Sequence, residues 1–217
     1  MNREELRSAF SKISTGDIAD AMVSVGLLPR TVTGLHSVAP GQKPAAGYAV
    51  TVKQMVRSVN RAEYALAQHG MVIDTILKAG DILVVDVDGR LDVCSGGALL
   101  VLRAKMLGAQ GFVINGCLRD VEDIAAIGLP VYLKGGCPVK SSPLLETVGI
   151  NIPVQLGDTQ VCSGDLIVMD QTGIIVIPVD RAEEIYTTAI KIQSREDRRM
   201  KYVEGGGTVA DAIKLEV

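Results

Sequence analysis

The feature that most constrains the fold is an alternation of short aliphatic segments with helical ones between residues 80 and 133. The aliphatic segments predict buried strands at 80–89, 111–115 and 131–133. Between them the pattern predicts helices at 96–108 and 120–127. This alternation favours a parallel or mixed sheet covered by helices, so the chain is predicted to be of the α/β class.

A sequence motif that occurs twice indicates two strands of one sheet system. Residues 80–89 and 164–173 both read G-D-apolar-apolar-V-apolar-D-x-x-G, which predicts a buried strand that ends in a turn. We expect two strand–turn units of the same sheet system, and an old duplication is a second explanation of the pattern.

The flanking regions complete the predicted order of elements. Helices are expected at 3–11, from the capping signal Ser14–Asp17 to about Gly26, at 61–79, and at 181–203. Residues 29–46 read as a loop, 47–52 as a strand, and 141–162 as β structure with bends at Pro143 and Pro153. Asp180 is predicted to cap the last helix, which the three glycines at 205–207 stop. We see no interdomain linker and predict one domain, 1–217, with a C-terminal helical arm at 181–217.

Composition excludes several classes of function. The 217 residues are 47 % hydrophobic but only 3 % aromatic, and the net charge is −3, so a basic nucleic-acid surface is not expected. No apolar run is long enough to span a bilayer, and the polar N-terminus is not a signal peptide. The four cysteines are widely spaced and are expected to be reduced thiols. We therefore expect a cytoplasmic protein that contacts neither nucleic acid nor membrane.

The most informative stretch for function is 111–123, where a strand runs into a glycine loop and then a helix. Ligands gather beyond the carboxyl ends of strands in such folds, and helix N-termini favour anions. Arg119 offers a planar donor for a carboxylate, and Asp120 offers hard oxygen for Mg²⁺ or Mn²⁺. The alternative is that Asp120 is only an N-cap and that Arg119 only pairs with Glu122 or Asp123.

A second stretch, Cys94–Leu100, places glycines before a helix. Successive free backbone N–H groups there can bind a carboxylate, and an ordinary loop with Ser95 as the cap explains the pattern equally well. Four lysines could act as Schiff-base amines, but none has a distinguishing context: Lys53, Lys105, Lys134 and Lys140.

At these two stretches the chain resembles the RraA-like family. The similarity runs from Ser14 to the C-terminal helix, and its specific part is Gly-Gly-Ala-Leu-Leu at 96–100 and Gly-Phe-Val-Ile-Asn-Gly-Cys-Leu-Arg-Asp at 111–120. The family includes class II 4-hydroxy-4-methyl-2-oxoglutarate / 4-carboxy-4-hydroxy-2-oxoadipate aldolases and the regulator of ribonuclease E activity A. The resemblance implies a swivelling β/β/α fold, like that of phosphohistidine domains.

The resemblance also implies roles for individual residues. Asp120 would hold a divalent metal, with Mg²⁺ expected and Mn²⁺ as the alternative, and Arg119 would bind substrate and stabilise an enolate. The loop at Gly97, Ala98, Leu99 and Leu100 would bind a small 2-oxo acid through backbone amides. Glu196 would complete the site from a neighbouring subunit, so that a homotrimer or homohexamer carries its sites between subunits.

One departure separates this chain from the aldolases. They carry an aspartate where this chain has Ala98, and alanine cannot transfer a proton. The sequence therefore predicts a metal-dependent lyase for a small 2-oxo acid, by retro-aldol cleavage of 4-hydroxy-2-oxo acids or decarboxylation of oxaloacetate, with standard aldolase activity in doubt. Two alternatives are a non-enzymatic regulator that binds a ribonuclease or another protein, and a Schiff-base lyase.

Overall fold

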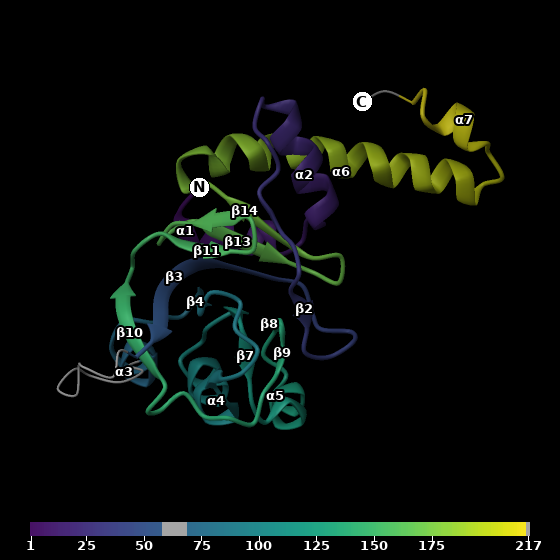
Figure 1. Ribbon diagram of the computed structural model, residues 1–217. Helices are drawn as coiled ribbons and strands as arrows, with labels where there is room; N and C mark the ends of the chain where they lie inside the picture. The colour runs from purple at the N-terminus through teal and green to yellow at the C-terminus, as the bar shows by residue number, and fades with distance from the viewer. Residues whose placement is uncertain (58–68, 216–217) are drawn as a thin grey trace.

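The computed structural model describes residues 1–57 and 69–215. Its centre is a curled sheet with helices on both sides, and a long helix extends beyond it toward the C-terminus (Figure 1). This arrangement confirms the expected layered α/β fold with a C-terminal helical arm.

The main sheet contains nine strands within the described residues, and β3, β4, β6 and β8 run parallel in it. From one edge to the other the strands are β1 (Thr31–Val32), β14 (Ile174–Ile177), β13 (Leu166–Met169), β3 (Ala45–Val56), β4 (Asp81–Asp86), β6 (Gly111–Asn115), β8 (Val131–Leu133) and β2 (His36–Ser37). The second half of β3 also pairs with β10 (Leu145–Ile150). The expected strands at 111–115 and 131–133 are confirmed, whereas the expected loop at 29–46 carries the short strands β1 and β2.

A second, smaller sheet continues the parallel strands. Its strands are β5 (Cys94–Gly96), β7 (Cys117–Leu118) and β9 (Gly135–Gly136), all parallel. Only Gly116 separates β6 from β7, and only Lys134 separates β8 from β9. The chain therefore passes directly from the main sheet into the small one, and the loops that follow β5, β7 and β9 lie together beyond its carboxyl edge.

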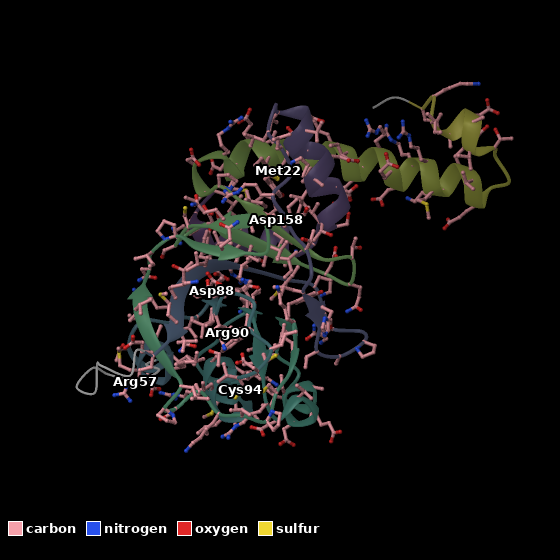
Figure 2. All side chains as sticks on the ribbon, viewed as in Figure 1. Met22, Arg57, Asp88, Arg90, Cys94 and Asp158 are labelled. Atoms are coloured by element: carbon pink, nitrogen blue, oxygen red, sulfur yellow. The ribbon has the colours of Figure 1, made fainter. Side chains whose placement is uncertain are left out.

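The helices form two groups on opposite sides of the main sheet (Figure 1). The first group comprises α3 (His69–Thr75), α4 (Ala98–Met106) and α5 (Val121–Ile127); the second comprises α1 (Arg3–Phe10), α2 (Thr15–Ser24) and α6 (Ala182–Glu204), with the 3-10 turn η1 (Val179–Arg181) before α6 and α7 (Val209–Ala212) after it. Figure 2 labels Met22 in the second group and Cys94 near the first. Of the helix predicted at 61–79, residues 61–68 lie outside the described residues. No helix in the described part of the chain is long and apolar enough to cross a membrane.

Alternating side chains of the central strands enter different cores. Leu83 and Val85 of β4 pack under the first helix group, whereas Ile82 and Val84 face the inside of the curl. There they meet the hairpin of β11 (Val154–Leu156) and β12 (Thr159–Val161). Because both faces are covered, these strands read as continuous aliphatic runs.

The two copies of the repeated motif, at 80–89 and 164–173, form the same turn before their strands. Gly80 and Gly164 have left-handed φ values of 91° and 88°. Each following aspartate accepts a hydrogen bond from the backbone N–H three residues earlier: Asp81 from Lys78 at 2.8 Å, and Asp165 from Cys162 at 3.0 Å. The strands that follow, β4 and β13, flank β3 on its two sides, parallel and antiparallel to it. The expectation of two strand–turn units in one sheet is confirmed.

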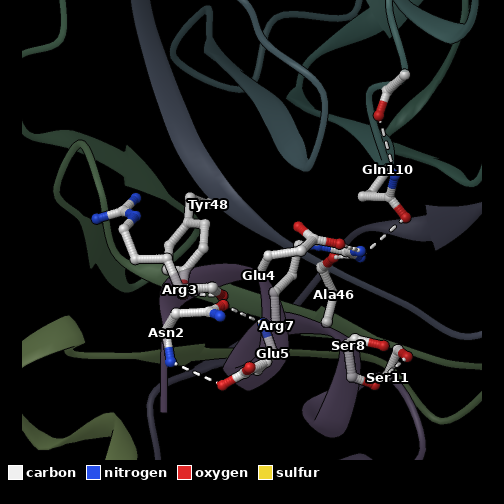
Figure 3. A network of polar contacts seen from close by, with 11 residues as sticks. Asn2, Arg3, Glu4, Glu5, Arg7, Ser8, Ser11, Ala46, Tyr48 and Gln110 are labelled. Atoms are coloured by element: carbon white, nitrogen blue, oxygen red, sulfur yellow. Dashed lines mark hydrogen bonds and ion pairs between the residues drawn. The ribbon is translucent and has the colours of Figure 1, made fainter.

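The first helix is fixed to the sheet by a polar network (Figure 3). The Arg7 guanidinium donates to the Ala46 carbonyl at 3.2 Å and to the Gln110 side chain at 3.1 Å. The Tyr48 hydroxyl donates to the Arg3 carbonyl at 2.8 Å. These contacts join the N-terminus to the start of the central strands.

One predicted cap is wrong. Arg181, not Asp180, occupies the N-cap position of α6, and no side chain caps that helix. The 3-10 turn over Val179–Arg181 places Asp180 one residue too early to reach the free N–H groups of the first turn.

Asp170, at the end of the second strand–turn unit, links the sheet to the first residue of α2, whose N-cap is Ser14. Its carboxylate accepts hydrogen bonds from the Thr15 N–H at 2.8 Å, the Thr15 hydroxyl at 2.9 Å and the Thr172 N–H at 2.8 Å. We predict that Asp170→Ala lowers the free energy of unfolding by about 2–3 kcal/mol, because it leaves these donors without their acceptor. Denaturant unfolding measures this change, and Asp180→Ala, which removes an exposed non-capping carboxylate, is the control with a change of under about 0.5 kcal/mol. Equal losses in the two variants would contradict the assignment.

Candidate active site

Arg119 and Asp120 lie at the carboxyl end of β7, where the chain turns into α5. Asp120 has φ 56° and ψ 40°, a left-handed conformation that non-glycine residues rarely adopt. It occupies the N-cap position of α5, but its side chain makes no capping hydrogen bond. The interpretation of Asp120 as an ordinary N-cap is therefore wrong. Its left-handed φ is shared with Asp88 and Asn151, so the candidate role of Asp120 rests on the position of its carboxylate.

The Asp120 carboxylate points across to the loop between β5 and α4. Its Oδ2 lies 3.4 Å from the Ala98 backbone nitrogen and 3.5 Å from Arg119 Nε. Both contacts are long, and the side chain is 40 % exposed, so the carboxylate keeps free coordination sites. Arg119 pairs with Asp120 itself, not with Glu122 or Asp123 as the alternative interpretation held.

Gly97 makes this approach possible. A Cβ atom added to Gly97 would lie 2.9 Å from Arg119 Cγ and would overlap the Asp120 carboxylate. Any side chain at this position must therefore displace the pair. The glycine is required for close contact between two loops, which is a reason that the sequence pattern alone does not show.

The start of α4 supplies backbone donors next to the pair. Gly97 is the N-cap, without a side-chain cap, and its carbonyl accepts a hydrogen bond from the Leu100 N–H at 3.1 Å. The first-turn N–H groups of a helix have no acceptor within the helix. The Ala98 N–H donates to Asp120 Oδ2 at 3.4 Å, and Leu99, the next residue, lines the pocket. Of the expected binding loop Gly97, Ala98, Leu99 and Leu100, the Ala98 and Leu100 amides already have acceptors, in Asp120 and Gly97.

A pocket of about 230 Å³ joins these groups. Its lining comes from the β5–α4 loop, the Arg119–Asp120 pair and a third segment after β9: Cys94, Ser95, Gly96, Gly97, Leu99, Leu100, Arg119, Asp120, Lys140, Ser141 and Ser142. We call this the polar pocket. Sequence reasoning named Lys140 only as one of four undistinguished lysines and missed the two serines, because only the third strand of the small sheet brings them to this edge.

A second pocket, of about 360 Å³, is also lined by Arg119 and Asp120. Its other lining residues are mainly apolar: Leu118, Val121, Gly136, Cys137 and Pro138. We call this the apolar pocket. The arginine–aspartate pair thus belongs to two pockets of different chemistry.

Three cysteines form a small buried cluster in the small sheet, made by Cys94, Cys117 and Cys137. Cys94 and Cys117 are direct partners in the β5–β7 ladder. Burial raises the pKa of both the Cys94 and the Cys117 thiol above the usual value. Cys94 reaches the wall of the polar pocket as a neutral thiol at physiological pH.

Glu196 is not brought to the pair within one chain. It lies on α6, in the helix group on the opposite side of the main sheet from α4 and α5 (Figure 1). Its carboxylate pairs with Arg195 at 3.3 Å and Arg199 at 2.8 Å. A role for Glu196 therefore requires a second copy of the chain.

Other polar residues of the central strands serve the fold. Asp86 is 2 % exposed; it pairs with Lys53 at 2.8 Å and accepts a hydrogen bond from the Asn115 amide at 2.9 Å. Across residues 1–57 and 69–215 there is no group of three histidine, cysteine or acidic side chains suited to enclosing a metal ion. A metal at Asp120 would therefore have one protein carboxylate and otherwise water or substrate as ligands.

With the geometry established, comparison with known proteins identifies the family. A family model described as Aldolase/RraA matches residues 15–176. The chain belongs to the RraA-like family. The expected family resemblance is confirmed.

Individual relatives agree with this assignment. The chain is 33 % identical to an uncharacterized protein of Methanocaldococcus jannaschii over 190 residues, which is 86 % of each chain. It is 29 % identical, over 89 % of its own length and 86 % of the relative's, to a Halalkalibacterium halodurans protein provisionally named as a 4-hydroxy-4-methyl-2-oxoglutarate aldolase. The structure of Streptomyces coelicolor RraAS2, described as an unusual member of the RNase ES inhibitor RraA family, superposes with a TM-score of 0.78 at 26 % identity, covering 90 % of this chain and 96 % of that one. The family thus includes proteins named as lyases and proteins named as regulators.

The cysteine cluster gives a direct test of the site's packing. We predict that a disulfide reagent at neutral pH reacts quickly with one thiol, Cys162, which is half-buried, and slowly with the other three cysteines, which are buried. All four should react after unfolding, and Cys162→Ser should remove the fast phase. Rapid reaction of Cys94 in the native protein would contradict the described wall of the polar pocket.

Proposed function

We propose that the protein is a divalent-metal-dependent lyase that forms a pyruvate enolate from a small 2-oxo acid. The observation that carries this proposal is the half-exposed Asp120 carboxylate, which lies in the polar pocket beside Arg119 and has only long contacts, to Arg119 Nε and the Ala98 N–H. The aldolase names of relatives support the same chemistry.

The polar pocket is suited to the 2-oxo carboxylate. Its positive groups are Arg119, Lys140 and the α4 N-terminus with the Leu99 amide. A carboxylate bound there would place its adjacent keto oxygen near Arg119 and Asp120. Arg119, 48 % exposed, has room to donate to that oxygen.

Asp120 fits a magnesium ion that retains most of its water. Mg²⁺ is commonly held by one or two carboxylates with water and substrate oxygens as the other ligands, so a single free carboxylate is a sufficient protein anchor. The ion would polarise the keto group of the substrate. Arg119 stabilises the negative charge on the enolate oxygen as the bond beyond C3 breaks.

The two candidate reactions differ in their need for a base. In retro-aldol cleavage the C3–C4 bond breaks, its electrons enter the enolate, and the C4 hydroxyl loses a proton as C4 becomes a carbonyl. Ala98 cannot accept that proton, and in this account Glu196 of a second copy would accept it in a homotrimer or homohexamer. Decarboxylation of oxaloacetate releases CO₂ without a proton at C4, so we expect it to be the faster reaction in this chain.

A regulator of a ribonuclease is the second candidate, because the fold is shared with RraAS2 of Streptomyces coelicolor. A regulator would not turn over any 2-oxo acid, and its binding to a partner would not depend on the Asp120 carboxylate. The tests below separate the two.

Metal and arginine dependence form the first test of the site. We predict pyruvate release from oxaloacetate with Mg²⁺, loss of that activity in EDTA, and recovery with added Mg²⁺ or Mn²⁺. Arg119→Ala should lower kcat by about 100-fold or more, while Arg119→Lys retains a part, because a lysine keeps the charge but loses the two-pronged donor. Full activity in EDTA would contradict the metal role, and unchanged turnover in Arg119→Ala would contradict the site.

The close contact at Gly97 gives an independent test. We predict that Gly97→Ala lowers kcat/KM by about 10-fold or more, because the new methyl group displaces the Asp120 carboxylate. Gly135→Ala in the neighbouring β9 is the control, since its Cβ would meet only Cys117 Sγ at 3.8 Å. Normal melting temperatures in both variants, with activity lost only in the first, would support the account; full activity in Gly97→Ala would contradict it.

A further inference from the structure

If the proposed function holds, the apolar pocket can be assigned to one part of the substrate. It touches the same arginine–aspartate pair as the polar pocket, and is the larger of the two, at about 360 Å³ against about 230 Å³. Arg119 and Asp120 are therefore the two residues that a ligand of either pocket would contact.

The charges of the site are divided unequally between the two pockets. Lys140, the two serines and the α4 N-terminus all belong to the polar pocket. Beyond the shared pair, the apolar pocket is lined by Leu118, Val121, Gly136, Cys137 and Pro138, none of which carries a charge. Apart from Arg119, which the proposed function assigns to the enolate oxygen, the pocket offers no positive group to a second carboxylate. An alkyl or aryl group would gain about 25 cal/mol per Å² buried.

We infer that the apolar pocket binds the departing half of the substrate, and that this chain prefers 4-hydroxy-2-oxo acids whose C4 carries an uncharged alkyl or aryl group. The products are pyruvate and an apolar aldehyde or ketone. The C3–C4 bond breaks, its electron pair enters the enolate, the C4 hydroxyl becomes the carbonyl of the departing half, and the released proton finally returns to C3 of pyruvate. No oxidant or reductant is needed.

Gly136 is a suitable position for a substitution that fills this pocket. A Cβ atom added there would lie 3.6 Å from Val121 Cγ1 and 3.8 Å from the Leu118 carbonyl, both ordinary contacts, and the glycine is not in the left-handed region. A larger side chain can therefore be introduced without a backbone clash and would occupy the pocket that Gly136 lines. Ala126→Leu, on the exposed surface of α5 and outside the lining, adds similar bulk as a matched control.

Binding of unreactive analogues gives the first arm of the experiment. 2-Oxo-4-phenylbutanoate and 2-oxoglutarate share the 2-oxo acid head, lack the C4 hydroxyl, and differ in whether the distal group is apolar or charged. With Mg²⁺ present, calorimetry should show the phenyl compound binding at least about 10-fold more tightly. Gly136→Leu should abolish this difference, and Ala126→Leu should retain it. Equal affinities in the wild-type protein, or tighter binding of 2-oxoglutarate, would overturn the inference.

Turnover gives the second arm and separates this inference from the proposed function. Among 4-hydroxy-2-oxo acids with methyl, pentyl or carboxylate groups at C4, we expect the pentyl compound to have the highest kcat/KM. Gly136→Leu should lower that value at least about 10-fold relative to the value for the methyl compound, whereas Ala126→Leu should leave all values within about 2-fold. An equal loss on all substrates, or a changed oligomeric state without a changed substrate preference, would overturn the inference and identify the pocket as an interface. Absence of all turnover with the analogue preference intact would contradict the lyase proposal alone.

Discussion

The approach of the Asp120 carboxylate to the backbone at Gly97 is the contact on which the rest of the site depends. It brings together two loops that are more than twenty residues apart in sequence, and it requires both a glycine on one side and a left-handed aspartate on the other. Such strain persists only where the surrounding structure holds it. Here the pairing of β5 with β7 fixes the point at which each of the two loops begins.

The small sheet explains why these loops meet. Its strands continue the parallel strands of the main sheet after a break of one residue at Gly116 and at Lys134, so their carboxyl ends share one edge. The main sheet is buried on both faces by helices and by the β11–β12 hairpin, which fixes the direction of those strands. A rigid aliphatic core thus positions a polar site at its rim, with the buried thiols of Cys94, Cys117 and Cys137 between the two.

Local patterns were sufficient for most elements but not for the lining of the site. The aliphatic runs located β6 and β8, and the repeated G-D motif located β4 and β13, because these signals depend on neighbouring residues. The cap at Asp180 was mispredicted because a 3-10 turn shifted the start of α6 by one residue. The position of Lys140 beside Arg119 and the apolar pocket could not be predicted, since both arise from pairing of β9 with β7. Glu196 also lies away from the pair within one chain, so its role in the site would need a second copy and stays a proposal.

The central claim is that Arg119 and Asp120 hold a metal and a pyruvate enolate together. Oxalate, a planar dianion that resembles this enolate, tests it most directly by titration calorimetry with and without Mg²⁺. The account predicts oxalate binding that requires Mg²⁺ and weakens by about 10-fold or more in Asp120→Asn, which keeps the size but removes the charge. Oxalate affinity that is unchanged by EDTA and by Asp120→Asn would contradict it.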